Sequence, residues 1–102
     1  MERPFADSDP ESVDWLRRPG GGYEASHFAN GYSAHLAVFW TGTGGAELRH
    51  VTCEIKVYAD ESALRSQQPS GDPVWEKSLL CVGSLRTYQP MVARWMKEFE
   101  PA

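Results

Sequence analysis

Hydrophobic and polar residues alternate most regularly between residues 51 and 58, which read Val-Thr-Cys-Glu-Ile-Lys-Val-Tyr. Successive side chains of a β-strand point to opposite faces of the sheet. The pattern therefore predicts a strand over about residues 47–59 that buries its apolar side. That side consists of Val51, Cys53, Ile55 and Val57.

Two earlier segments, residues 23–28 and 33–40, predict a hairpin joined by Asn30-Gly31. Asn-Gly is a strong hairpin signal because both central residues of a type I′ turn need positive φ. This turn places Tyr23 opposite Val38. A second turn over residues 41–45 leads into the third strand. If Thr41 pairs with Ala46, Leu36 lies opposite Val51 and Ala34 opposite Cys53, so the apolar residues of both strands share one core face.

A fourth strand is expected from Val74 to about Val82, after a polar connection over residues 60–72 that has room for one helical turn at 60–65. The alternation of this strand breaks at Ser78-Leu79-Leu80. The break predicts either a β-bulge or burial on both faces of the sheet.

Apolar residues then recur at helical spacing and predict a C-terminal helix that begins near residue 88. They are Tyr88, Met91, Val92, Trp95, Met96 and Phe99. Thr87 or Gln89 is the expected cap, and Pro90 is expected in the first turn, where its missing N–H is tolerated. We expect Trp95, Met96 and Phe99 to pack on Leu36, Val38 and Ile55.

Residues 1–22 form an N-terminal arm ahead of a single domain over residues 23–102. Asp9 and Pro10 predict a short helix over about residues 10–18. Pro19 and the glycines 20–22 predict a flexible joint after it. The arm then either folds back through Trp15 and Leu16 or waits for a partner. The predicted class is α+β: a four-stranded antiparallel sheet of two consecutive hairpins plus a fourth strand, with the C-terminal helix packed on one face and a short N-terminal helix.

Size and composition narrow the functional classes. A chain of 102 residues is expected to be one domain. Its formal charge of −4 is spread along the sequence and disfavours non-specific nucleic-acid binding. The start of the chain has no apolar stretch typical of a signal peptide, and no segment is long enough to span a membrane. We therefore expect a cytoplasmic protein with Cys53 and Cys81 as free thiols, a disulfide between them being the alternative in an oxidising compartment.

The sheet face opposite the helix carries more apolar surface than a solvated face needs, which is typical of a protein contact. The residues expected to bind a partner are Phe28, Phe39, Leu48 and Tyr58 on this face, with Trp15, Arg17 and Arg18 from the arm. Two alternatives remain open: the arm covers the face, or the aromatic residues only stabilise cross-strand pairs.

Candidate chemistry is sparse, and no catalytic, cofactor or metal residue is assigned. His35 and His50 are expected to be diagonal neighbours on the same face, where a metal or acid–base role is the minor alternative. The glycines at 42–45 lie between two antiparallel strands, so a hairpin turn explains them better than a phosphate loop. No Gly-x-Ser-x-Gly motif or cysteine signature occurs.

The order α-β-β-β-α, with the first hairpin left out, resembles the double-stranded-RNA-binding domain. The last helix of that family begins with a lysine cluster, whereas residues 87–91 here read Thr-Tyr-Gln-Pro-Met. No function is carried over from the resemblance. The sequence therefore favours a small non-enzymatic interaction module: an adaptor, an assembly subunit or a mobile-element inhibitor of a host protein, with a protein partner or a second copy bound. The alternative is a nucleic-acid-associated protein that uses the aromatic sheet face, and a small enzyme or metal site is third.

Overall fold

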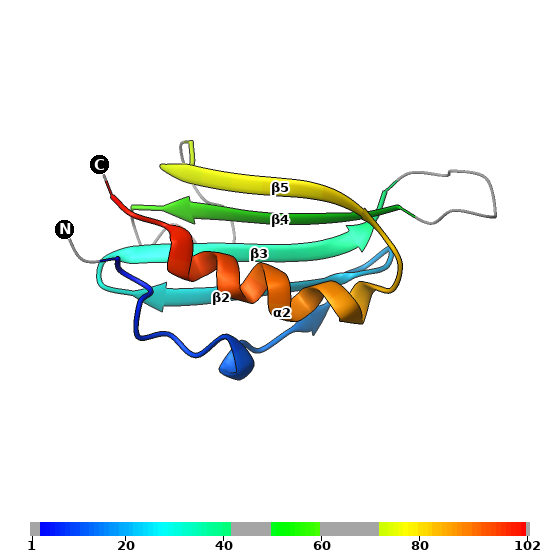
Figure 1. Ribbon diagram of the computed structural model, residues 1–102, viewed down its shortest axis with the longest axis horizontal. Helices are drawn as coiled ribbons and strands as arrows, with labels where there is room; N and C mark the ends of the chain where they lie inside the picture. The colour runs from blue at the N-terminus through cyan, green and yellow to red at the C-terminus, as the bar shows by residue number, and fades with distance from the viewer. Residues whose placement is uncertain (1–2, 42–49, 60–71, 102) are drawn as a thin grey trace.

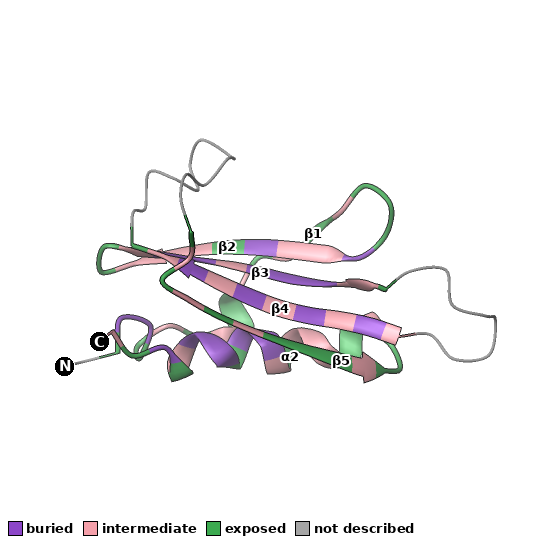
Figure 2. Cartoon of the chain, turned by 90° about the horizontal axis from the view of Figure 1, so that it is seen from above, coloured by how far each residue is buried: buried purple, intermediate pink, exposed green. Residues whose placement is uncertain are grey.

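The computed structural model describes residues 3–41, 50–59 and 72–101, and confirms the α+β class. In this part of the chain one antiparallel sheet has the order β1-β2-β3-β4-β5. Its strands are β1 (Leu16–Arg17), β2 (Tyr23–Ala29), β3 (Tyr32–Trp40), β4 (His50–Tyr58) and β5 (Trp75–Val82). The helix α2 (Leu85–Trp95) lies across one face and runs into the 3-10 turn η2 (Met96–Glu98), while the 3-10 turn η1 (Pro10–Ser12) belongs to the arm. Figures 1 and 2 show the resulting two layers.

The first hairpin has the predicted turn and register. Asn30 and Gly31 both have positive φ, at 52° and 82°, as a type I′ turn requires. Tyr23 lies opposite Val38, and Ala29 lies opposite Tyr32. The local turn chemistry was therefore sufficient to set this register.

The pairing of β3 with β4 is shifted by four residues from the predicted register, which was wrong. Leu36 lies opposite Ile55 and Ala34 lies opposite Val57. The Thr41 N–H donates to the His50 carbonyl at 2.8 Å, so the ladder continues to the end of β3. Residues 42–45 of the turn expected over 41–45 lie outside the described residues, as does the helical turn expected at 60–65. Because side chains alternate with a period of two, an even shift leaves every residue on its predicted face.

The core lies between the sheet and α2. All four apolar residues of the alternating β4 pattern are fully buried, as predicted. Trp95, Met96 and Phe99 are buried with them, and the same cluster holds Ala34, Leu36, Val38, Val92 and Ala93. The polar residues of β4 point the other way and are half-buried.

The N-terminal arm folds back onto the helix side of the sheet. The helix predicted over residues 10–18 is wrong: Asp9 caps only η1, and Leu16–Arg17 pairs with β2 instead. A nine-residue helix gains little from its own hydrogen bonds, whereas the glycine turn lets β1 complete hydrogen bonds to β2. Gly22 has φ 107°, and a Cβ there would lie 2.6 Å from the Val38 carbonyl oxygen, so this turn needs glycine. Phe5, which no sequence pattern singled out, is fully buried in the core.

Strand β5 forms an open edge of the sheet in the described part of the chain. Its ladder with β4 runs without interruption from His50 opposite Val82 to Val57 opposite Trp75, so the predicted bulge is absent. The alternative, burial on both faces, is also wrong, because Leu79 and Leu80 are 48% and 59% exposed. An edge position explains the loss of alternation, since neither face there is fully covered.

The helix begins three residues earlier than predicted, at Leu85, with Ser84 at the N-cap position. Pro90 therefore lies inside α2 and not in its first turn. The missing N–H removes the bond that would reach the Arg86 carbonyl four residues back. The helix tolerates this loss because Pro90 is exposed and the apolar stripe on the opposite side is buried.

Replacing Trp95 tests whether this stripe holds the two layers together. Trp95 is only 5% exposed, so Trp95→Ala is expected to lower the free energy of unfolding by about 3–5 kcal/mol. Chemical denaturation of both proteins measures the difference. Arg94→Ala, at an exposed position of the same helix, is the control and should change the value by less than about 0.5 kcal/mol. An equal loss of unfolding free energy in the two variants would show that Trp95 is not part of the core.

Candidate functional site

The sheet face opposite α2, here called the open face, is divided into rows by the strand register. The two outer rows contain the aromatic residues: the first row is Phe28, Ser33 and Tyr58, and the fourth is Phe39, Thr52 and Leu80. The two rows between them contain the charged residues. The second row is Ser26, His35, Lys56 and Glu76, and the third is Leu16, Glu24, Ala37, Glu54 and Ser78. Two apolar ends therefore flank a charged middle. The predicted contact surface is not one continuous aromatic patch.

The residues expected to bind a partner are distributed over different surfaces. Phe28 and Tyr58 lie in the first row of the open face, whereas Phe39 lies in the fourth; all three are half-buried. Leu48 lies outside the described residues. The two polar rows between these aromatic side chains separate Phe39 from the other pair.

Arg18 covers Phe39 at the fourth row. Its guanidinium carbon lies 4.3 Å from the centre of the Phe39 ring, a cation–π distance. The Arg18 Nε lies 3.8 Å from a carboxylate oxygen of Glu24, and the same oxygen lies 4.0 Å from the Nε2 of His35. Part of the aromatic surface expected to meet a partner is thus occupied by the arm's own arginine.

His35 and His50 are not neighbours, so that expectation was wrong. His35 lies opposite Lys56 in β4, and His50 lies opposite Val82 near the other end of the sheet. The four-residue shift of the β3–β4 register is the cause. Among the described residues no three His, Cys, Asp or Glu side chains are grouped as metal ligands would be. These two histidines are therefore too far apart in the sheet to form the metal site considered as the alternative.

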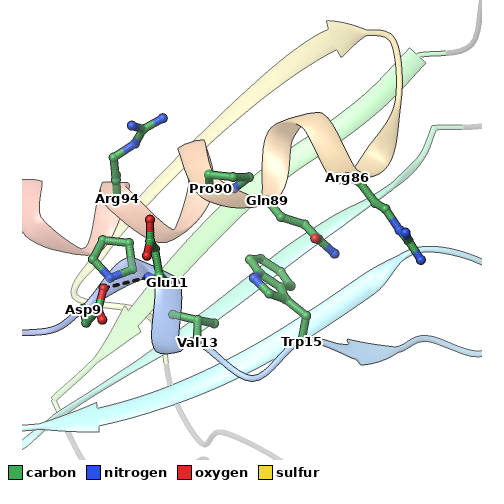
Figure 3. Close-up of a pocket in the computed structure, with 9 residues that line it drawn as sticks. Asp9, Glu11, Val13, Trp15, Arg86, Gln89, Pro90 and Arg94 are labelled. Atoms are coloured by element: carbon green, nitrogen blue, oxygen red, sulfur yellow. Dashed lines mark hydrogen bonds between the residues drawn. The ribbon is translucent and has the colours of Figure 1, made fainter.

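Trp15 and Arg17 lie on the helix side and not on the open face. Trp15 lines a cleft of about 450 Å³ between the arm and α2, where its ring extends toward Gln89 (Figure 3). Val13 and Pro90 also line this cleft, with Arg86 near Trp15 and Asp9, Glu11 and Arg94 toward the other end. The cleft carries both signs of charge around an apolar wall.

Most of the exposed large apolar side chains in the described residues lie on or beside β5. Leu79, Leu80 and Val82 of this strand are 48%, 59% and 52% exposed, and Val74 just before it is 53% exposed. Leu16 of β1, on the other flank of the sheet, is 61% exposed. Figure 2 looks onto the β5 edge and shows much of the strand exposed. This edge was not predicted from the sequence, although the break of alternation at Leu79-Leu80 was its signal.

The helix covers only the first half of β5. Trp75 packs against Phe99 with ring centres 5.7 Å apart, and Lys77 forms a 2.9 Å ion pair with Glu98. Beyond them Leu79 points to the helix side and stays half exposed. The first half of the strand also carries the charges of Glu76 and Lys77, which discourage edge-to-edge pairing, and the second half carries none.

Three comparisons, with protein-family models, with curated proteins and with solved structures, each found no match for this chain. The function is therefore argued from the described residues alone. Within them no helix is long and apolar enough to cross a membrane.

His35 generates a prediction about pH. Burial lowers the pKa of His35 below its ordinary 6.5, against the opposing influence of Glu24 and Glu54, and its Nδ1 is buried without a hydrogen bond. Between the lowered pKa and about 6.5 the unfolded chain binds a proton that the folded chain does not. Stability should therefore fall as the pH drops below about 6.5, and His35→Gln should flatten this part of the profile. Denaturation curves of both proteins between about pH 5 and 8 measure the free energy of unfolding at each pH. The same pH dependence in His35→Gln would show that other groups cause the loss of stability.

The cysteines generate a prediction about reactivity. Both are free thiols, Cys53 buried and Cys81 half-buried. Burial, followed by the neighbouring Cys81 thiol, raises the pKa of Cys53 to about 12. Because the thiolate is the reactive form, a thiol reagent at neutral pH should label Cys81 in the folded protein and Cys53 only after unfolding. Mass spectrometry of Cys81→Ser before and after denaturant measures this, and rapid labelling of Cys53 in the folded variant would contradict it.

Proposed function

We propose that this protein is a small non-enzymatic protein-interaction module that assembles through the outer edge of β5. The observation that carries the proposal is the apolar second half of this open edge, from Leu79 to Val82, with three large side chains about half exposed. Unpaired backbone N–H and C=O groups on such an edge bind another strand. The open face as a whole is a weaker candidate because charged rows cross its middle.

The occupant of the edge is a second copy of β5, antiparallel to the first across a two-fold axis. Residues directly opposite in an antiparallel pair point to the same face, so only registers that preserve the face are allowed. With Leu80 opposite the partner's Leu80, Leu79 meets the partner's Cys81. Val82 then meets the partner's Ser78, and no charged residue faces a like charge.

Two features of the monomer suit this arrangement. The helix leaves the second half of β5 uncovered, so the helices of two copies need not collide. The pairing also removes the exposed leucines from water, which stabilises the pair by about 25 cal/mol for each Å² of apolar surface buried. The edge then becomes the middle of one continuous sheet.

The open face gives less support to the alternative that the protein binds nucleic acid. Glu24, Glu54 and Glu76 lie in its middle rows. Carboxylates at these positions repel a phosphate backbone, and nucleic-acid binding depends on cationic contacts.

Charge placed on the edge tests the proposal. Leu80→Lys should weaken self-association about tenfold or more, because a lysine at the pairing centre meets its own copy. Sedimentation velocity over a range of protein concentrations measures the dissociation constant. Val74→Lys, at an exposed position just outside β5, is the matched control and should keep the wild-type value. Wild-type protein that stays monomeric at every concentration would overturn the proposal.

Two aromatic variants separate the edge from the open face. Tyr58→Asp and Phe39→Asp change residues of β4 and β3 on the open face, away from the outer edge of β5, and both should leave self-association unchanged. Equal loss in both variants would place the contact on the open face instead.

Cross-linking tests the register. In a Cys81→Ser background, Leu80→Cys should form an intermolecular disulfide under mild oxidation, because directly opposite Cα atoms lie about 4.5–5.5 Å apart, within the range of a disulfide. Glu76→Cys in the same background is the control and should remain monomeric on a non-reducing gel. Cross-linking by Glu76→Cys alone would contradict this register.

A further inference from the structure

We propose that the hollow between the β1–β2 turn and the start of α2 binds a small oxyanion ligand, a phosphate or carboxylate group attached to an aromatic ring. This site is independent of the β5 edge. The hollow measures about 350 Å³, at the small end of the range of about 300–1,000 Å³ for small-molecule sites. It is lined by Arg17, Arg18, Gly21, Gly22, Tyr23, Trp40 and Leu85.

Two arginines converge on one phenol at the side of this hollow. Arg17 lies opposite Tyr23 in the β1–β2 pair, and Arg86 reaches the same hydroxyl from the first turn of α2. Arg18 lines the hollow from the next position of the chain. The guanidinium group of Arg18 itself lies over Phe39 on the open face, so Arg17 and Arg86 are the two cations at the Tyr23 hydroxyl, where two strands and a helix meet.

Carboxylates neutralise neither Arg17 nor Arg86 in the described part of the chain. The side-chain ion pairs of arginine and lysine there are Arg3–Glu100, Arg18–Glu24 and Lys77–Glu98. Arg17 and Arg86 take part in none of them, and Glu24 is shared between Arg18 and His35. In a chain with a net charge of −4, a cationic corner with so little compensation is the feature that indicates an anionic ligand.

The location of Arg86 strengthens the charge argument. A cation in the first turn of a helix meets the positive end of the helix dipole, which is unfavourable. The first turn of α2 holds no acidic residue. A bound oxyanion between the arginines would compensate both the helix end and the like-charged guanidinium groups.

The aromatic residues that line the hollow indicate what the ligand carries besides its oxyanion group. Tyr23 and Trp40 both line the hollow. The glycine turn passes close to the indole, since a Cβ on Gly21 would lie 3.7 Å from the Trp40 Cδ1. Flat rings and guanidinium planes favour a planar body by stacking. The hollow therefore suits a ring that carries one oxyanion better than a bare ion.

Four probes test the site on the full chain: inorganic phosphate, phenyl phosphate, benzoate and neutral benzyl alcohol. Nuclear magnetic resonance titration of the Trp40 indole and the Tyr23 ring reports binding at the hollow. Saturable binding of phenyl phosphate or benzoate, with benzyl alcohol about tenfold weaker or absent, is expected from charge-assisted hydrogen bonds. The tighter of the two anions identifies the oxyanion as phosphate or carboxylate. Equal binding of benzyl alcohol, or shifts that do not saturate, would overturn the proposal.

Matched arginine variants locate the charge. Arg17→Gln and Arg86→Gln change exposed side chains and should each weaken the preferred anion about tenfold. Arg94→Gln, on the same helix but without an interaction with Tyr23, should keep the wild-type affinity. Melting curves establish that each variant is folded. An equal loss of affinity with Arg94→Gln would show that the overall charge of the protein causes the effect, and would contradict the assignment of Arg17 and Arg86 to the site.

Titration of Tyr23 gives a second readout. Hydrogen bonding from Arg86, helped by Arg17, lowers the pKa of Tyr23 below its ordinary 10.0. A bound oxyanion takes these donors and adds negative charge, so saturating ligand should raise the pKa of Tyr23, as should Arg86→Gln without ligand. A Tyr23 titration that stays unchanged at saturating anion would place the ligand elsewhere.

Discussion

One helix is too narrow to cover this sheet, and most of the structure follows from that mismatch. An α-helix with its side chains is about 10–12 Å wide, whereas strands lie about 4.8 Å apart, so α2 covers little more than two strands of five. The helix lies over β3 and β4, where the fully buried residues are concentrated. Each flank of the sheet must then be covered by something else or remain exposed.

The two flanks of the sheet differ in how their apolar residues are covered. On the β2 side the N-terminal arm closes the core: Phe5 is fully buried, the Ser8 hydroxyl lies 2.9 Å from the Nε2 of His27, and Asn30 donates to the Pro4 carbonyl at 2.7 Å. On the β5 side Trp75 and Lys77 meet the end of the helix, but the apolar second half of the strand has no comparable cover in the described residues. This asymmetry is the reason for proposing β5 as the assembly edge.

Charge is distributed as unevenly as apolar cover. The middle rows of the open face combine acidic groups with His35 and Lys56, whereas Arg17 and Arg86 meet at Tyr23 on the helix side. The glycine turn that folds the arm back brings Arg17 opposite Tyr23, and Arg86 comes from the first turn of α2. The proposed assembly edge and the proposed anion site lie at opposite flanks of the sheet, β5 and β1, so the two proposals are independent of each other.

Local sequence determined the α+β class, the first hairpin and the inward face of every long central strand. The Asn30-Gly31 turn fixes its register by backbone conformation, and the alternation of β4 fixes its faces because side chains repeat with a period of two. The β3–β4 register, the strand at Leu16–Arg17 and the start of α2 were not determined locally. Several even shifts of register satisfy the same alternation, and a two-residue strand exists only through its partner. Which of the candidate residues share a surface was likewise decided by tertiary structure, because it depends on register and on where a narrow helix leaves the sheet uncovered.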